Sequence, residues 1–86
     1  MDIFIYFIPN QETEIDELED EIEELLDEKG EVTGSGIGSM GANIDIEIYD
    51  DEMNRFSINE FLIGLRKLNF PDGTYYVCDG ERHNLY

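Results

Sequence analysis

The sequence has one cysteine, one histidine, two prolines and no long apolar run among its 86 residues. Cys78 alone cannot form an internal disulfide, whereas a secreted domain of this size usually carries several. The apolar run over residues 3–8 is too short for a signal peptide, and far below the roughly 20 residues of a membrane span. These absences predict a cytoplasmic protein that does not cross a membrane.

Basic residues are also scarce, because five Lys or Arg stand against 22 Asp or Glu and the net charge is −17. Such a chain repels the phosphates of nucleic acid and the anionic surface of a membrane. It attracts cationic partners, whose encounter it steers. The alternative is that the acids simply keep a small protein soluble. The composition thus argues against nucleic-acid and membrane binding and leaves these two interpretations.

The length permits one domain, residues 1–86, with a small core, since such a chain buries only about 60–65% of its unfolded surface. A catalytic cleft between two domains is thereby excluded. His83 lies near the C-terminal end, and neither it nor Cys78 falls into a metal-ligand or nucleophile pattern. We therefore expect no catalytic residue, no metal site and no cofactor, and the protein is not predicted to be an enzyme.

The periodicity of apolar residues predicts a strand, a helix, two strands, a second helix and another strand. This order is that of an α+β, ferredoxin-like split βαβ (βαββαβ) fold. Right-handed crossovers then place both helices on one face of an antiparallel sheet with strand order 4-1-3-2. A short fifth strand over 81–86 follows if Asp79-Gly80 forms the two-residue hairpin that this pair favours. The predicted elements are strand 2–8, helix 12–28, strands 31–39 and 43–50, a helix after Ser57, and strand 74–78.

Capping residues mark the ends of both predicted helices. Asn10 or Thr13 is expected to cap the start of the first helix, and Gly30 to end it in the left-handed conformation. The segment Ser57–Glu60 is a capping box for the second helix, enclosed by a hydrophobic staple. Local sequence therefore favours both helices independently of the core.

The segment Gly36–Gly41 matches the pattern G-x-G-x-x-G. A dinucleotide-binding loop must open a helix, but a strand follows here and no Lys or Arg lies near it in the sequence. The better interpretation is a hairpin whose bare glycine face lets a helix, a neighbouring chain or a ligand backbone come close. A partner strand adding to this edge is a further hypothesis.

The predicted first helix is strongly acidic, with 11 of the 22 acids between residues 12 and 28. Seven like-charge pairs at i,i+4 oppose such a helix by about 1.5–3.5 kcal/mol at low salt. A mixture of Glu and Lys would give solubility without that cost. We therefore predict that this face binds a cationic protein. The residues expected to hold the partner are Asp16, Asp20, Glu23, Glu24 and Asp27.

The sheet face without helices is the second candidate surface. An exposed aromatic patch on a sheet usually indicates a partner, a dimer or a covering segment. RNA-binding domains of this topology stack bases there, but acidic neighbours argue against that function. The alternative function is a homo-oligomeric structural or regulatory module, such as a homodimer, that associates through this face. The expected contacts are Tyr6, Tyr49, Asp45 and Glu47, with one of Tyr75 or Tyr76.

The sequence GEVTGSGIG over residues 30–38, followed by NIDIE over 43–47, resembles a pattern in small acidic bacterial proteins. Some proteins of this kind are encoded beside secreted toxins and serve as immunity proteins. The resemblance follows the element order of the whole chain, although its motif is short. It implies a non-enzymatic inhibitor that occludes a basic toxin site. A toxin nuclease is the most concrete partner, since its active site must be basic to hold phosphates.

Overall fold

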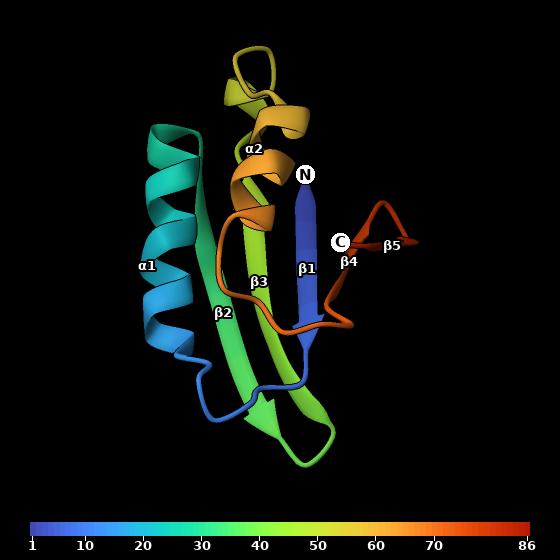
Figure 1. The fold of residues 1–86 in the computed structure, drawn as a ribbon. Coiled ribbons are helices and arrows are strands. Elements are labelled where there is room, and N and C mark those ends of the chain that lie inside the picture. The colour runs from blue at the N-terminus through green and yellow to red at the C-terminus, as the bar shows by residue number, and fades with distance from the viewer.

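Two helices pack on one face of a five-stranded antiparallel sheet, and no helix covers the other face (Figure 1). The computed structural model describes all 86 residues. This is an α+β fold, as the sequence predicts. The elements are β1 (Asp2–Phe7), α1 (Ile15–Leu26), the 3-10 turn η1 (Asp27–Lys29), β2 (Gly30–Gly38), β3 (Gly41–Ile48), the 3-10 turn η2 (Asp50–Glu52), α2 (Ile58–Arg66), β4 (Tyr75–Cys78) and β5 (Glu81–Asn84).

The strands lie in the order β2-β3-β1-β4-β5. Every neighbouring pair is antiparallel, and central β1 places Ile5 opposite Ile44 on one side and Tyr76 on the other. The order differs from the predicted 4-1-3-2 by the added β5, which lies outside β4. The cause is the hairpin at Asp79 and Gly80, whose φ angles of 52° and 77° suit a tight two-residue turn.

One cluster of buried hydrophobic side chains lies between the sheet and the two helices. The helices meet where Gly64 leaves room for Leu25, because a Cβ on Gly64 would lie 2.7 Å from a Leu25 methyl carbon. No helix is both long and apolar enough to cross a membrane. The cluster comprises Ile3, Ile5, Phe7, Leu18, Ile22, Leu26, Ala42, Ile44, Ile46, Ile48, Phe61, Leu62, Leu65, Phe70, Tyr76 and Leu85.

Helix α1 begins later than predicted, at Ile15 rather than at residue 12. Asn10 and Thr13 close a turn ahead of the helix instead of capping it. The Asn10 backbone N–H donates to Thr13 Oγ1 at 3.0 Å, and the Thr13 hydroxyl donates to Asn10 Oδ1 at 3.0 Å. The cap position falls to Glu14, whose side chain makes no capping hydrogen bond. The predicted cap residues are thus used by the preceding loop.

The end of α1 also differs from the prediction. The helix ends at Leu26, and its C-cap is Asp27, with φ 55° and ψ −126°. Gly30 has an extended φ of −174° and already belongs to β2, so the left-handed cap expected there is wrong. Glycine is needed at residue 30 because a Cβ would collide with the Glu47 carbonyl oxygen of the neighbouring strand.

Helix α2 begins where its sequence predicts, with one of the two hydrogen bonds of the predicted capping box. The Glu60 backbone N–H donates to Ser57 Oγ at 3.3 Å, and the Phe56 and Phe61 rings lie 5.4 Å apart as a hydrophobic staple. This start is local and independent of the acidic helix.

Replacing Ser57 with alanine is therefore expected to lower the free energy of unfolding by about 1 kcal/mol. The change leaves one N–H at the start of α2 without its side-chain partner. Urea titration measures the effect. The matched control is Ser39→Ala in the exposed β2–β3 turn, which should remain within about 0.5 kcal/mol of the wild type. Equal midpoints for the two variants would contradict the capping role.

Strand β2 contains a β-bulge at Thr33. The register with β3 runs from Glu31 opposite Glu47 to Gly34 opposite Asp45, with one extra residue between Val32 and Gly34. The bulge shifts the alternation of side chains by one position. Gly34 therefore lies on the helix-free face beside Asp45, whose Oδ2 is 3.7 Å from the place of a Cβ at residue 34.

Candidate partner-binding surfaces

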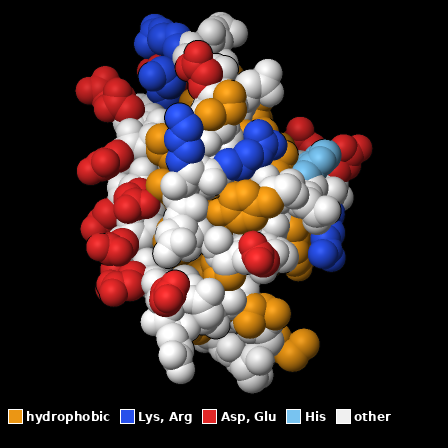
Figure 2. Space-filling model, in the orientation of Figure 1, with side chains coloured by type: hydrophobic (Ala, Val, Ile, Leu, Met, Phe, Trp, Pro, Cys, Tyr) orange, Lys and Arg blue, Asp and Glu red, His pale blue; other side chains and the backbone are white.

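All five residues predicted to hold a cationic partner are exposed. We call Asp16, Asp20, Glu23, Glu24 and Asp27 the acidic flank. The first four share one side of α1: Asp16, Asp20 and Glu24 point away from its buried stripe, whereas Glu23 borders that stripe and reaches β2. Acidic side chains follow this side of the molecule in Figure 2, where Figure 1 places α1. The fifth, Asp27, is the C-cap and leaves the helical path.

The charge of the acidic flank is not compensated within the molecule. The three ion pairs join Met1 to Asp50, Arg55 to Glu52, and His83 to Glu81, all outside α1. On α2, the Arg66 Nε donates to the Leu85 carbonyl at 2.8 Å. The acids of α1 are therefore available to a partner with opposite charge.

The shorter helix reduces the expected repulsion within α1. Only four of the seven like-charge i,i+4 pairs lie inside Ile15–Leu26. They oppose the helix by about 1–2 kcal/mol at low salt, less than the sequence-based value. These four pairs are 16–20, 17–21, 19–23 and 20–24.

The acidic flank extends onto the edge of the sheet through Glu23. Its carboxylate accepts a hydrogen bond from the Val32 backbone N–H of β2 at 2.8 Å. Desolvation by burial is the main cause that raises the pKa of Tyr49, followed by hydrogen bonding to Glu31 and the negative charges of Glu31, Glu47 and Glu23. The negative charges of acids on α1, β2 and β3 thus all act on one tyrosine. We call the region of Glu23, Glu31, Glu47 and Tyr49 the acidic end of the edge.

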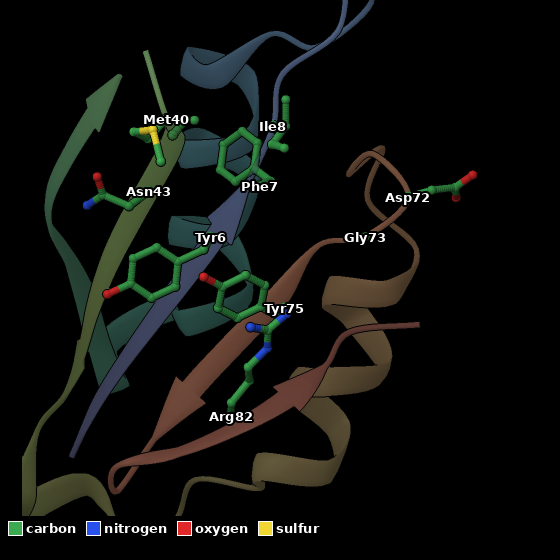
Figure 3. A pocket seen from close by; sticks show the side chains of 11 residues that line it. Tyr6, Phe7, Ile8, Met40, Asn43, Asp72, Gly73, Tyr75 and Arg82 are labelled. Atoms are coloured by element: carbon green, nitrogen blue, oxygen red, sulfur yellow. The ribbon is translucent and has the colours of Figure 1, made fainter. Parts of the chain in front are cut away.

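The helix-free face carries an aromatic stack over β1, β4 and β5, away from the β2 edge. The rings of Tyr6 and Tyr75 lie 5.2 Å apart and nearly parallel, and Arg82 Cζ lies 3.7 Å from the centre of the Tyr75 ring. Figure 3 shows these three side chains in a row across β1, β4 and β5. They border a hollow of about 470 Å³, which Ile8 and Met40 also line. Apolar and cationic groups are therefore available together here.

The four predicted sheet contacts fall into two groups on this face. Tyr6 belongs to the aromatic stack, whereas Glu47 and Tyr49 lie at the acidic end of the edge. Asp45 lies on β3 beside Gly34 and accepts a hydrogen bond from Asn43 Nδ2 at 2.9 Å. The structure therefore does not bring the four residues together into one site.

Sequence reasoning missed three contributors to these surfaces. It did not assign Glu31 to the acidic end, Arg82 to the aromatic stack, or the Glu23 carboxylate to the backbone of β2. The Asp79-Gly80 hairpin is the signal: its register pairs Arg82 with Val77, which puts Arg82 on the same face of the sheet as Tyr75. Tyr76, the other tyrosine considered, is buried against the helices.

The residues with the most reactive side chains are dispersed. Burial raises the pKa of the Cys78 thiol, the nearby charge of Asp79 adds to this, and a raised pKa disfavours the nucleophilic thiolate. The His83 ring stacks on Tyr76 with centres 5.2 Å apart. No three His, Cys, Asp or Glu side chains gather as a metal-ligand set.

Comparisons with protein-family models, with curated proteins and with solved structures find no match to this chain. Function is therefore inferred from the geometry and the charge of the chain itself.

Proposed function

We propose that this is a non-enzymatic, cytoplasmic protein-binding protein that occludes a basic partner with the acidic flank of α1. One observation carries the proposal: 11 acids lie between residues 12 and 28, and none of them pairs with Lys or Arg. An immunity-type inhibitor of a toxin nuclease is its most concrete form, because a nuclease holds phosphates in a basic site. The βαββαβ order and the helices on one face favour the ferredoxin-like class for the fold.

The energetics of α1 favour this function over mere solubility. Like charges oppose the helix, and no basic residue occupies its last turn, where a cation would favour the helix dipole. A surface with both signs interspersed also gives solubility and avoids these costs. A partner with a basic site relieves the repulsion on binding. The acids therefore lower the stability of the free protein but favour the complex.

Charge reversal in the acidic flank tests the proposal. A partner is first captured from the native cell at low salt, and the capture is repeated at about 0.5 M salt, where exposed charges are screened. The triple variant Asp16→Lys, Asp20→Lys, Glu24→Lys is then expected to associate about tenfold more slowly at low salt. Stopped-flow or surface-based kinetics measure the rate.

The matched control reverses three exposed acids outside α1, namely Asp2, Asp51 and Asp72, and changes the net charge equally. It should associate within about threefold of the wild-type rate, because steering depends on where the charge lies. Equal slowing in both variants would show that only the net charge matters. An unchanged association rate in the α1 variant would contradict the proposal.

A second function, homo-oligomerisation through the helix-free face, is favoured by the aromatic stack and by the exposed apolar residues beside it. Ile8 and Met40 are 74% and 93% exposed at the border of the hollow. Sedimentation at low salt and at about 0.5 M salt distinguishes the two functions, because apolar association survives screening. A salt-resistant dimer would establish the second function, and a monomer leaves the face without that role.

A further inference from the structure

Strand β2 forms an open edge of the sheet along its glycine-rich half. It pairs with β3 on one side only, and residues 35–38 are exposed. An edge strand presents a row of backbone N–H and C=O groups to a pairing partner. Native proteins usually blunt such an edge with lysine, proline, a β-bulge or a covering segment, and the bulge of β2 at Thr33 lies before this half of the strand. This half of β2 has neither lysine nor proline.

Hydrogen-bond alternation identifies the groups that point outward. The two-residue turn closes at Gly38 opposite Gly41, and backbone groups in an antiparallel pair alternate between facing the partner strand and facing away. Counting back from the turn, the N–H and C=O groups of Ile37 and Ser35 face outward. Farther from the turn, the outward N–H of Val32 already donates a hydrogen bond to the Glu23 carboxylate. The available edge is therefore the segment 35–37.

The acidic flank lies beside this available edge. Glu23 contacts β2 directly, and Asp20 and Asp16 lie one and two turns before it on the same side of α1. A helix rises 1.5 Å per residue, which places Asp16 roughly 10 Å along from the Glu23–Val32 contact. A strand rises about 3.3 Å per residue and the bulge takes up one residue, so Ser35 lies roughly 7 Å along, between the levels of Asp20 and Asp16. A strand added here would run under these carboxylates.

The opposite side of the edge is bare. Gly34 and Gly36 face the helix-free side without side chains, and Asp45 and Asn43 lie next to them on β3. Long side chains of an added strand can lie over the glycines and reach the Asp45 carboxylate. Both sides of the edge therefore suit basic residues.

We infer that the β2 edge receives an extended Lys- or Arg-rich segment of the partner protein as an additional strand. Backbone pairing at Ser35 and Ile37 supplies the geometry, and the acidic flank selects basic side chains on the side facing α1. The inference rests on the proposed function in taking the partner to be basic. A second copy of this chain fits poorly, because edge-to-edge pairing would bring two acidic flanks together.

The probe is an acetylated and amidated peptide of alternating threonine and lysine, about eight residues long, which matches a typical strand. A second peptide replaces the central threonine with proline and keeps the charge but cannot continue a strand. Calorimetry measures both affinities, and amide exchange followed by NMR locates the contact. We expect the first peptide to bind at least about tenfold more tightly, and to protect the amides of Ser35 and Ile37.

Variants at Ser35 provide the matched pair. Ser35→Pro removes the outward N–H and should weaken binding of the first peptide about tenfold, whereas Ser35→Ala retains that N–H and should bind as the wild type does. Circular dichroism confirms that each variant is folded. If Ser35→Pro is unfolded, the exchange experiment on the wild type decides the question.

The outcomes separate the two proposals. Equal binding of the two peptides, unprotected Ser35 and Ile37 amides, or no binding at low salt would overturn strand addition. The α1 charge-reversal variant tests the acids: undiminished peptide binding there would remove the acidic flank as the binding determinant while leaving the edge occupied. A dimer of the chain alone that Ser35→Pro abolishes would make a second copy the occupant instead.

Discussion

Replacing Gly30 with alanine is expected to lower the free energy of unfolding by about 1–3 kcal/mol, a large part of the stability of a small domain. A Cβ at this buried position would collide with the Glu47 carbonyl oxygen and lie 3.2 Å from Ile48 Cα and from Leu26 Cδ2. Two of these contacts are backbone atoms of β3. The strands must therefore separate, because no side chain can rotate away to relieve the collision.

The matched control is Gly38→Ala, at the exposed end of the same strand. A Cβ there meets nothing within 4 Å, so the substitution should be neutral or slightly stabilising through the unfolded state. Urea titration of both variants gives the comparison. A Gly30→Ala midpoint equal to that of Gly38→Ala would show that the Gly30 site accommodates a side chain, and that the packing of β2 on β3 is looser than described.

Replacing Asp27 with glycine is expected to raise the free energy of unfolding by about 1–2 kcal/mol. Asp27 has φ 55° and ψ −126°, a region that side chains disfavour, and strain of this kind costs about 1–3 kcal/mol. Its negative charge also lies at the C-terminal end of α1, where the helix dipole disfavours an acid. Glycine removes both costs, although its greater freedom in the unfolded chain offsets about 0.5–1 kcal/mol.

Asp27→Asn separates the two causes, since asparagine removes the charge but keeps a side chain at positive φ. Its gain should be smaller than that of glycine, and the glycine gain should persist at high salt, where the charge effect is screened. Thermal unfolding at two salt concentrations measures both. A destabilised Asp27→Gly variant would contradict backbone strain at this residue.

The sequence predicted most of the fold because its signals are local. Alternating Ile44, Ile46 and Ile48 identified a half-buried strand, and the Ser57 capping box identified the start of α2. The predicted ends of α1 were wrong because other interactions use the residues that were expected to cap the helix. Asn10 and Thr13 bond to each other, and Gly30 is required by a strand that only the folded sheet brings close.

The candidate surfaces were predictable in charge but not in arrangement. The count of acids is enough to identify α1 as a binding candidate, whereas the Glu23–Val32 contact depends on how α1 lies against β2. The bulge at Thr33 has no sequence signature here, yet it decides which face the glycines occupy. Arg82 reaches Tyr75 because β5 pairs with β4 through the Asp79-Gly80 hairpin, a local feature whose register was not followed to its side chains.

The central place of β1 has a consequence for the folding kinetics. β1 comes first along the chain, yet it pairs with β4, so Ile3 lies opposite Cys78 and most of the chain forms the intervening loop. Such distant pairings form slowly, whereas the β2–β3 hairpin closes over two residues and α1 precedes it directly. The surface proposed to receive a partner is thus encoded in one contiguous stretch that needs only short-range contacts. That stretch is expected to become ordered earlier than the insertion of β1 between β3 and β4.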